Sequence, residues 1–293
     1  MTKFLKIVLA TRPKTLIASL APIMIGASMG RYRSGDFHWI YVFAIFFAAA
    51  LIQIATNFYN DAIDGFEKRD TEHRLGPTRF SGTDPDFLNL LKKLALSCLV
   101  LAGALGVFVT FRGGPLVLLV GVPALFLAYL YTGTKYSLSA NGWADGFVVL
   151  YFGVLPVWVL ELVLVQRPGL LSLLMGLQCG LLCNVLLIIN NLRDIKEDSV
   201  TGKRTLIVRL GRKFGLYFLA GFLFTPYLIN FYWLETRFFR AGLWSFLLLP
   251  MAVYIFNKVR KTKPSKVYNF ILGLSSLHLF IFSLIFSLGI LSS

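Results

Sequence analysis

Acidic residues are scarce in this chain of 293 residues, which has 14 Asp and Glu against 29 Lys and Arg and a formal net charge of +15. Charged residues of both signs make up only 15% of the chain, whereas soluble proteins carry about 25%. Hydrophobic residues account for 57%. This composition excludes an ordinary soluble enzyme, a disordered chain and a nucleic-acid-binding module, so no nucleic-acid partner is expected. It indicates a polytopic α-helical membrane protein that has the lipid bilayer as its surroundings.

Cysteine and histidine are equally rare, with three of each. The cysteines lie in apolar runs and form no CxxC pair, and the histidines are scattered along the chain. Zinc sites need such residues at close, regular spacing. The sequence therefore gives no sign of a Cys/His metal centre, and the cysteines are expected to be small buried hydrophobic residues.

Long apolar runs are abundant. A helix that crosses the hydrocarbon core of about 30 Å needs about 20 mainly apolar residues. We expect nine such helices around a central cavity, in a single integral membrane domain covering 1–293. Barrel strands are excluded because the runs are too long and lack strict alternation. The nine runs are 13–30, 39–60, 89–111, 114–131, 143–163, 169–191, 214–232, 241–257 and 267–290.

Basic residues test this count. With the N-terminus in the cytoplasm, 23 of the Lys and Arg fall on the cytoplasmic side and 6 on the other side. Such a bias is the positive-inside pattern and supports both the count and the orientation. The sequence thus predicts a multi-pass protein of a bacterial inner (cytoplasmic) membrane. The two longest loops, 61–88 and 192–213, are both expected on the cytoplasmic face, where function should lie.

The few acidic residues gather in those two loops. Ten of the fourteen lie within 61–86 and 194–198. Asn60 and Asp64 are four residues apart, and Asn190, Asp194 and Asp198 also step by four. Residues at this spacing share one face of a helix, so each helix end presents a column of oxygen atoms.

A cluster of carboxylates next to a membrane needs a cation to neutralise it. Asp and Asn oxygens suit Mg²⁺, which proteins commonly hold through one or two carboxylates and substrate phosphates. Lys and Arg accompany both acidic groups and suit phosphate oxygens. A metal–diphosphate site is therefore one interpretation, and a salt-bridged cytoplasmic loop is the other. The spacing of Asn57 and Asp61 offers a competing helical face, which the pattern alone leaves open.

At these residues the chain resembles the UbiA superfamily of intramembrane prenyltransferases. The first motif is Asn60-Asp61-Ala62-Ile63-Asp64, although Lys68 stands where the family commonly has a further Asp. The second runs from Asn190 to Asp198 and is followed by Thr201-Gly202-Lys203-Arg204. Similar elements are Arg12-Pro13-Lys14 near the N-terminus, Gly76-Pro77-Thr78-Arg79 in the first loop, and Tyr131-Thr132-Gly133. The naphthoate prenyltransferases of menaquinone synthesis are the most similar group.

The resemblance implies a ligand set and two substrates. It implies transfer of a polyprenyl group from polyprenyl diphosphate to an aromatic acid with the help of Mg²⁺. The acceptor would be 1,4-dihydroxy-2-naphthoate, which loses CO₂ to give demethylmenaquinone. The implied metal ligands are Asn60, Asp64, Asp194 and Asp198. The implied substrate-binding residues are Arg12, Lys14, Arg79, Tyr131, Thr132, Lys135, Asn191, Arg193, Lys203 and Arg204.

Three further acids are candidates for the chemistry. Asp61 and Asp70 could assist the metal or accept the ring proton late in the reaction. Asp145 could orient the acceptor, although an acid in the first turn of a helix is also favoured by the helix dipole. Arg79 could pair with the acceptor carboxylate, or it could be a solvated loop residue.

Several alternatives stay open. Within the superfamily the acceptor could be 4-hydroxybenzoate, homogentisate or haem. The CDP-alcohol phosphotransferases also use Mg²⁺ and aspartates in membranes, but their motif is absent because Asp64-Gly65 is followed by Phe66-Glu67-Lys68-Arg69. A cation or proton transporter should have acids near mid-span, and Glu161 is the only one deep in a predicted span.

Overall fold

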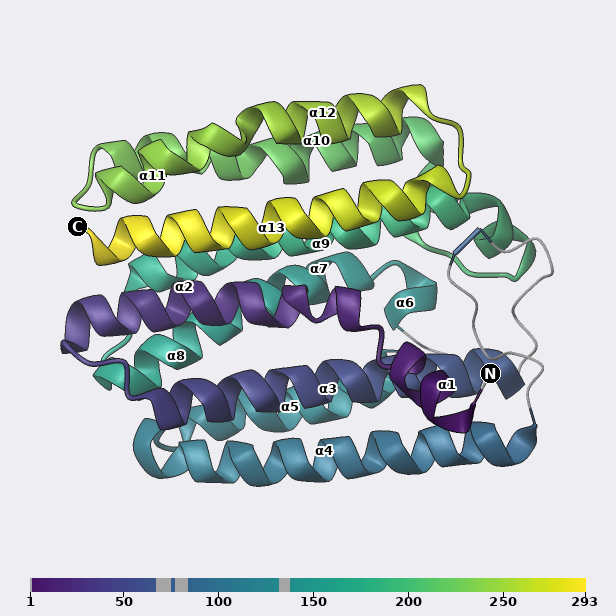
Figure 1. Cartoon of the computed structure of the whole chain (residues 1–293), viewed down its shortest axis with the longest axis horizontal. Helices are drawn as coiled ribbons and strands as arrows, with labels where there is room; N and C mark the ends of the chain where they lie inside the picture. Colours follow the sequence, from purple (N-terminus) through teal and green to yellow (C-terminus); the bar gives the residue numbers. More distant parts are fainter. Residues whose placement is uncertain (1, 67–74, 77–83, 132–137) are drawn as a thin grey trace.

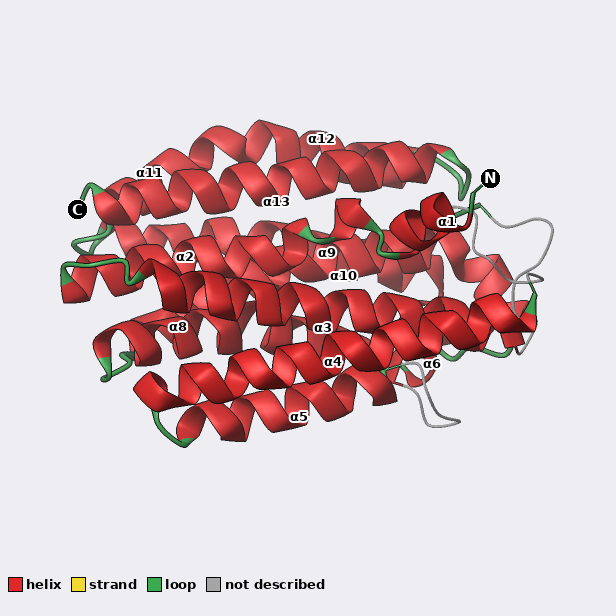
Figure 2. Ribbon diagram, turned by 60° about the horizontal axis from the view of Figure 1, so that its bottom comes forward, coloured by secondary structure: helices red, strands yellow, loops and turns green. Residues whose placement is uncertain are grey.

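The computed structural model describes residues 2–66, 75–76, 84–131 and 138–293. Within these ranges the regular structure is entirely helical, as expected (Figure 2). Long helices lie side by side in one bundle, with the chain beginning at the end where the α1 and α6 labels lie (Figure 1). The elements are α1 (Lys3–Ala10), η1 (Pro13–Thr15), α2 (Ile17–Ser34), α3 (Trp39–Phe66), α4 (Pro85–Gly113), α5 (Leu116–Leu130), α6 (Leu138–Asn141), α7 (Ala144–Val149), η2 (Leu150–Val154), α8 (Leu155–Val165), α9 (Leu170–Val200), α10 (Leu206–Leu234), α11 (Phe239–Ser245), η3 (Phe246–Leu248), α12 (Leu249–Lys261) and α13 (Val267–Leu291).

Each of the nine predicted apolar runs falls on a helix or a continuous group of helices. In the described part of the chain, seven of these are long and apolar enough to cross a membrane. Helix α5 is apolar but has 15 residues, about 22 Å at 1.5 Å per residue. Helix α2 has 18 residues but is not among the seven. The membrane character is confirmed, whereas the count of nine spans and the cytoplasmic N-terminus stay predictions.

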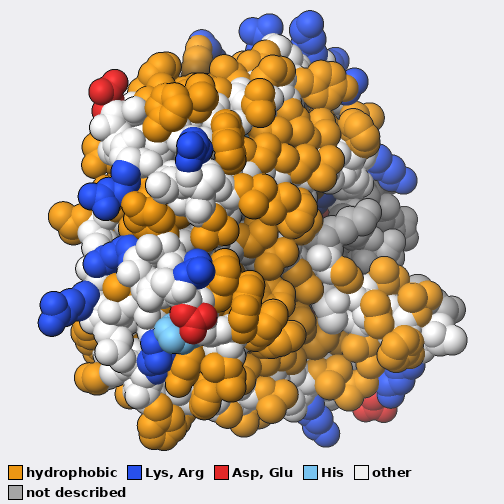
Figure 3. Space-filling model, turned by 60° about the vertical axis from the view of Figure 1, so that its left-hand side comes forward, with side chains coloured by type: hydrophobic (Ala, Val, Ile, Leu, Met, Phe, Trp, Pro, Cys, Tyr) orange, Lys and Arg blue, Asp and Glu red, His pale blue; other side chains and the backbone are white. Residues whose placement is uncertain are grey.

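The surface agrees with a lipid environment. Large apolar side chains such as Phe111, Leu119 and Leu170 are more than two-thirds exposed. Figure 3 shows hydrophobic side chains over much of one flank, with the charged side chains gathered toward its margins. Lipid tails can cover such a surface, whereas water would make it unstable.

The predicted loop 192–213 is mostly helical, which corrects its expected bounds. Helix α9 continues from the apolar run to Val200, and α10 already begins at Leu206. Hydropathy marks the membrane boundary, but a helix can continue beyond it as long as its backbone hydrogen bonds continue. Gly202 adopts a left-handed conformation with φ +77°, which glycine allows at low cost and which ends the helix. Helices α3 and α4 likewise extend into the predicted loop 61–88.

The interface between η2 and α9 shows how closely two elements approach. A Cβ atom at Gly153 would lie 2.3 Å from the Cα of Gly180. Only glycine at both positions lets the backbones meet there. The π-helical η2 is followed by Leu155 and then Pro156, whose missing N–H cannot continue the regular hydrogen-bond pattern. This contact fixes α7 and η2 against α9, and both sides contribute to the central cavity.

Candidate active site

A cavity of about 870 Å³ lies inside the bundle. This volume is at the upper end of the range typical of ligand pockets, about 300–1,000 Å³. Its walls come from α2, α3, α4, α5, η2 and α9, with further residues from α7 and α13. Apolar and small side chains line one part, and residues of both sequence motifs line another, among them Asn60, Asp61, Asp194 and Asp198 but not Asp64. The cavity is therefore amphipathic along its length.

Both motifs are helical, as their spacing predicts. Asn60, Asp61 and Asp64 lie in the last two turns of α3, and Asp194 and Asp198 lie in the last two turns of α9. Asp64 is completely buried, and the other three acids are at least nine-tenths buried. The two helix ends face a common space, although the motifs are far apart in sequence.

Lys203 connects the two motifs. Its backbone N–H donates to the carbonyl of Asp198 over 2.9 Å, which folds the chain back after α9. The ammonium then lies 3.7 Å from Oδ2 of Asp64 and 3.8 Å from Oδ1 of Asp198. One cation thus stands between a carboxylate of α3 and a carboxylate of α9. This arrangement shows that the space between the motifs suits positive charge.

The donor set fits Mg²⁺. Oδ1 of Asn60 is buried and has no hydrogen-bond partner among the described residues. Such an oxygen is costly unless a cation or a donor satisfies it. No group of three or more His, Cys, Asp or Glu in the described part of the chain has the geometry of a preformed metal site. The oxygens of Asn60, Asp64 and Asp198 nevertheless match a metal that prefers few carboxylates and completes its shell with phosphates.

The alternative face at Asn57 has a different environment. The side-chain amide of Asn57 donates to the carbonyl of Thr11 over 3.0 Å, which ties α3 to the segment after α1. Asn57 and Asn60 both line the cavity. The amide of Asn57 thus has a structural bond in this structure, whereas Oδ1 of Asn60 is buried without a hydrogen-bond partner among the described residues.

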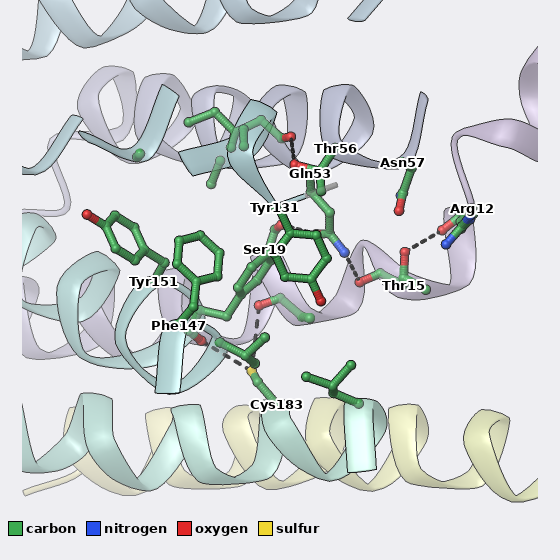
Figure 4. Close-up of a pocket in the computed structure, with 18 of the residues that line it drawn as sticks. Arg12, Thr15, Ser19, Gln53, Thr56, Asn57, Tyr131, Phe147, Tyr151 and Cys183 are labelled. Carbon is green, nitrogen blue, oxygen red and sulfur yellow. Dashed lines mark hydrogen bonds between the residues drawn. The ribbon is translucent and has the colours of Figure 1, made fainter. Parts of the chain in front are cut away.

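Arg12 is placed by an unusual backbone. It has φ +52°, a left-handed conformation, just before Pro13 opens η1. Its guanidinium donates to Oδ1 of Asp61. Figure 4 shows Arg12 at one end of the cavity, beside Thr15 and Asn57. The pair brings a cation and an acid from the first motif to the cavity wall.

Arg193 is the centre of a second polar cluster. It is 2% exposed and donates to both carboxylate oxygens of Asp194, at 2.7 and 2.6 Å. It also donates to the side-chain oxygens of Asn190 and Asn269, each at 2.7 Å. Asn269 of α13 in turn donates to the carbonyl of Leu75. Asp194 is therefore held by an arginine in this structure, in contrast to Asp64 and Asp198, which share a lysine.

The other predicted site residues fall into three groups. Asn191 and Tyr131 line the cavity. Asp145 is buried and does not line the cavity; its Oδ1 accepts a hydrogen bond from Asn184 over 3.0 Å. Arg204 lines a separate hollow together with Trp143 and Arg209. Lys14 lies in η1, but its side chain is outside the described part of the structure. Asp70, Arg79, Thr132 and Lys135 also lie outside the described residues.

Sequence reasoning missed several polar residues of the cavity. Ser19, Gln53 and Asn269 line it, although each stands alone in an apolar run. The only signal available was an isolated polar residue within a span, which by itself cannot show whether the side chain faces the interior or a neighbouring helix. The sequence pointed to Glu161 as an acid within a span but did not predict its partners. Its carboxylate accepts hydrogen bonds from Arg33 over 2.5 Å and from the backbone N–H of Gly169 over 2.7 Å.

Comparisons with known proteins agree with this geometry. The model of the UbiA prenyltransferase family matches residues 19–284. The chain belongs to the UbiA prenyltransferase family. It is 31% identical over 267 residues to a 1,4-dihydroxy-2-naphthoate octaprenyltransferase of Escherichia coli (strain K12), covering 85% of this chain and 82% of the relative. It is 30% identical over 211 residues to the protein of the same name from Mycobacterium leprae (strain TN), covering 72% and 71%.

Solved structures show the same fold. A UbiA homologue from Archaeoglobus fulgidus bound to DMAPP and Mg²⁺ superposes with a TM-score of 0.71, at 14% identity and 99% coverage of both chains. The same homologue bound to GPP and Mg²⁺ gives 0.70 at 15% identity. At these identities the likeness concerns the fold alone. The family model and the curated relatives show that this chain is a prenyltransferase. Its apolar helices show a multi-pass integral membrane protein, and its bacterial relatives support the cytoplasmic membrane as its location.

Proposed function

We propose that this chain transfers a polyprenyl group from polyprenyl diphosphate to 1,4-dihydroxy-2-naphthoate in a Mg²⁺-dependent reaction. The observation that carries the proposal is the approach of Asp64 and Asp198 to one cation, the ammonium of Lys203, which lines the charged end of a mainly apolar cavity. The naphthoate octaprenyltransferases among its relatives support the choice of acceptor.

The two ends of the cavity match the two ends of a polyprenyl diphosphate. Small and apolar residues of α4 and α5, such as Gly106, Gly121 and Val117, line one part and suit a hydrocarbon tail. Arg12, Arg193 and Lys203 line the other part and suit a diphosphate. A cation at the membrane surface also helps to attract the charged head.

The residues that would hold Mg²⁺ are Asn60, Asp64 and Asp198, with Asp194 as a further ligand. Mg²⁺, when bound there, would neutralise the diphosphate as it leaves. Asp194 is included because of the motif spacing. To bind the metal, its carboxylate would have to share its oxygens between Mg²⁺ and Arg193, or give up its two hydrogen bonds to Arg193. The guanidinium of Arg12 would donate to a diphosphate oxygen, and Asp61 would keep that guanidinium in place.

The reaction balances without a further reactant. The bond between C1 of the prenyl group and the diphosphate oxygen breaks, and its electron pair leaves with diphosphate. A carbon of the electron-rich ring forms the new bond to C1, and the acceptor carboxylate leaves as CO₂. The product is demethylmenaquinone in its reduced, quinol form. The ring carbon that forms the new bond to C1 loses its hydrogen as a proton, for which Asp61 is the described candidate acceptor, and the ring carbon that loses CO₂ takes up a proton in its place. The enclosed apolar wall would keep water away from the reactive C1.

The acceptor assay tests the proposal. Purified protein in detergent or lipid nanodiscs would receive Mg²⁺, a polyprenyl diphosphate and one of three acids: dihydroxynaphthoate, 4-hydroxybenzoate or homogentisate. Product mass would show which acid is prenylated, and EDTA would provide the metal control. We expect prenylated, decarboxylated naphthoate and loss of product with EDTA. A clear preference for hydroxybenzoate would overturn the acceptor, and no product from any acid would overturn the function.

The transporter alternative gains no support from its main candidate residue. Glu161 is the acid expected deep in a span, and it is wholly buried in bonds to Arg33 and to the backbone of Gly169. These bonds join α2, α8 and the start of α9 at the end of the bundle away from the motifs. Glu161 therefore serves to hold helices together, and an ion path through it is not needed to explain its presence.

A further inference from the structure

A cluster of basic residues lies in the turn between α12 and α13, at the same end of the bundle as the N-terminus (Figure 1). Helix α12 ends at Lys261, and α13 begins at Val267. Five of the nine residues from 258 to 266 are basic, and together they are called the basic turn here: Lys258, Arg260, Lys261, Lys263 and Lys266. All of them except Lys258 are exposed. Among the described residues, no acid forms an ion pair with any of the five.

The backbone of the basic turn has its own supports. One nitrogen of the Arg212 guanidinium donates to the carbonyls of Val259 and Thr262, at 3.0 and 2.8 Å. The hydroxyl of Tyr268, a residue with no exposed surface, also donates to the carbonyl of Thr262, over 3.1 Å. The last carbonyls of a helix otherwise lack partners within it. The side chains of the basic turn are therefore not needed to cap α12, and the exposed ones present their charge to the surroundings.

Apolar side chains that face lipid lie next to the basic turn. Tyr254 of α12 is 50% exposed and lies four residues before Lys258, so the two share one face of the helix. Phe270 of α13 is 61% exposed and lies four residues after Lys266. Aromatic residues followed by bases are typical of the membrane surface, where the stem of a lysine lies along apolar groups and its ammonium reaches the lipid headgroups. The basic turn thus lies at the level of the headgroups.

The charges of the basic turn are separate from those of the cavity. None of the five side chains, all of which the structure describes, lines the cavity, whose wall includes the cations Arg12, Arg193 and Lys203. A diphosphate held by those three cations would leave the basic turn without a counter-charge. Five like charges within nine residues repel one another, so an anion from another source is favoured there.

The basic turn is joined to a residue of the site. The backbone N–H of Asn269 donates to the carbonyl of Lys266 over 3.0 Å, in the first turn of α13. The side-chain oxygen of Asn269 accepts from Arg193 over 2.7 Å, and Arg193 in turn holds Asp194. This contact places the basic turn at the end of the bundle that carries the motifs. Whatever fixes the basic turn also steadies the start of α13, which presents Asn269 to Arg193.

We infer that the basic turn binds the phosphate of an anionic phospholipid headgroup. Ammonium and guanidinium groups give phosphate oxygens charge-assisted hydrogen bonds, and clusters of four or more bases beside a membrane span attract anionic lipids. The acyl chains of the same lipid lie along exposed apolar side chains such as Tyr254 and Phe270. The bound headgroup neutralises the repulsion within the turn. Its partner is therefore a lipid of the surrounding bilayer, whereas the prenyl substrate uses the cavity.

Lipid titrations of the full-length protein in a non-ionic detergent test the site. Native mass spectrometry would give the Kd of the first bound palmitoyl-oleoyl phosphatidylglycerol and that of the matching phosphatidylcholine. We expect wild type to bind phosphatidylglycerol more tightly. The triple variant Lys261→Gln/Lys263→Gln/Lys266→Gln should bind phosphatidylglycerol at least about tenfold more weakly, with phosphatidylcholine binding unchanged, because three headgroup contacts are lost.

Two further variants separate a site from net charge. Lys3→Gln/Lys92→Gln/Lys93→Gln removes the same charge from exposed lysines of α1 and α4, and it should keep the wild-type preference. Lys261→Arg/Lys263→Arg/Lys266→Arg keeps the charge of the turn and should keep the preference as well. If the triple glutamine variant does not stay monodisperse, Lys261→Gln/Lys263→Gln decides by the same titration.

Hydrogen exchange locates the bound lipid. Nanodiscs of equal parts phosphatidylglycerol and phosphatidylcholine would be compared with nanodiscs of phosphatidylcholine alone. Backbone amides from 258 to 270 should exchange at least about threefold more slowly with phosphatidylglycerol, since the headgroup steadies the turn and the start of α13. The triple glutamine variant should show no such difference. Saturating polyprenyl diphosphate should not displace phosphatidylglycerol from wild type, because it occupies the cavity.

Three results would overturn the inference. Equal affinity of wild type for the two lipids would show that the turn does not select an anionic headgroup. An equal loss in the turn variant and in the control on α1 and α4 would show that net charge alone attracts the lipid. Displacement of phosphatidylglycerol by polyprenyl diphosphate would place the lipid in the cavity. None of these measurements requires prenyl transfer, so the lipid site and the proposed function are tested separately.

Discussion

Asp64 of α3 and Asp198 of α9 approach the same ammonium group, that of Lys203, at 3.7 and 3.8 Å. Asp64 has no exposed surface, and Asp198 is 8% exposed. Two buried carboxylates at this separation from one cation would repel each other if that charge were absent. The relationship explains why both motifs carry acids at helix ends, and it leads directly to the first two experiments.

The carboxylates themselves can be neutralised one at a time. We expect Asp64→Asn and Asp198→Asn each to lower kcat/KM for polyprenyl diphosphate at least about 100-fold, because each removes a charge that holds the metal. Rates measured across a Mg²⁺ titration would check this. Asp86→Asn changes an exposed acid at the start of α4 and should leave the rate unchanged. Near-normal rates in both motif variants would remove the proposed metal ligands.

Lys203 should compete with the metal for the same carboxylates. In Lys203→Met, the two acids lose a cation that they share in the Mg²⁺-free protein, which should therefore melt about 5 °C lower than wild type. Saturating Mg²⁺ should recover most of this loss because the metal replaces the ammonium. Thermal melts with and without Mg²⁺ measure the difference. An equal loss in both conditions would show that Lys203 acts independently of the metal position. Lys213→Met, on the exposed side of α10, provides the control.

Arg12 and Asp61 should act as a unit on the diphosphate. We expect Arg12→Gln to raise the KM for polyprenyl diphosphate about tenfold, since it removes a charge-assisted donor. Asp61→Asn should raise this KM by a similar factor, because the guanidinium loses the partner that orients it, and should also lower kcat, because Asp61 is the candidate acceptor of the ring proton. The double variant should then be less impaired than the sum of the two single changes, a coupling that a double-mutant cycle detects. Strict additivity would contradict the pairing.

The ion pair of Glu161 and Arg33, at the end of the bundle away from the motifs, should affect stability alone. Glu161→Gln leaves the guanidinium of Arg33 without its acid, and we expect the free energy of unfolding to fall by about 3 kcal/mol. The kcat of the folded protein should not change, because the motifs lie at the other end of the bundle. Chemical denaturation and the transfer assay test the two statements together. Loss of kcat at full folding would contradict a purely structural role. Replacing both partners by leucine should recover part of the stability.

The sequence by itself determined the membrane class, the helical state and the two motif faces of this protein. Hydropathy records burial in lipid directly, and a spacing of four residues places side chains on one helix face whatever surrounds the helix. The spacing therefore predicts that Asn60 shares a helix face with Asp64, and that Asp194 shares one with Asp198. The extension of α9 to Val200 could not be predicted from hydropathy, because the apolar pattern ends at the membrane surface whereas the helix continues beyond it.

Only the tertiary structure decided which residues meet across the bundle. The contacts between Lys203 and Asp64, between Arg12 and Asp61, and between Ser19 and Gln53 join segments distant in sequence, and local spacing carries no information about them. The same holds for Arg204, which lies at a separate hollow although it directly follows a lysine of the site. Close helix packing sets these positions, because the glycines that let η2 approach α9 fix the walls to which every cavity residue is attached.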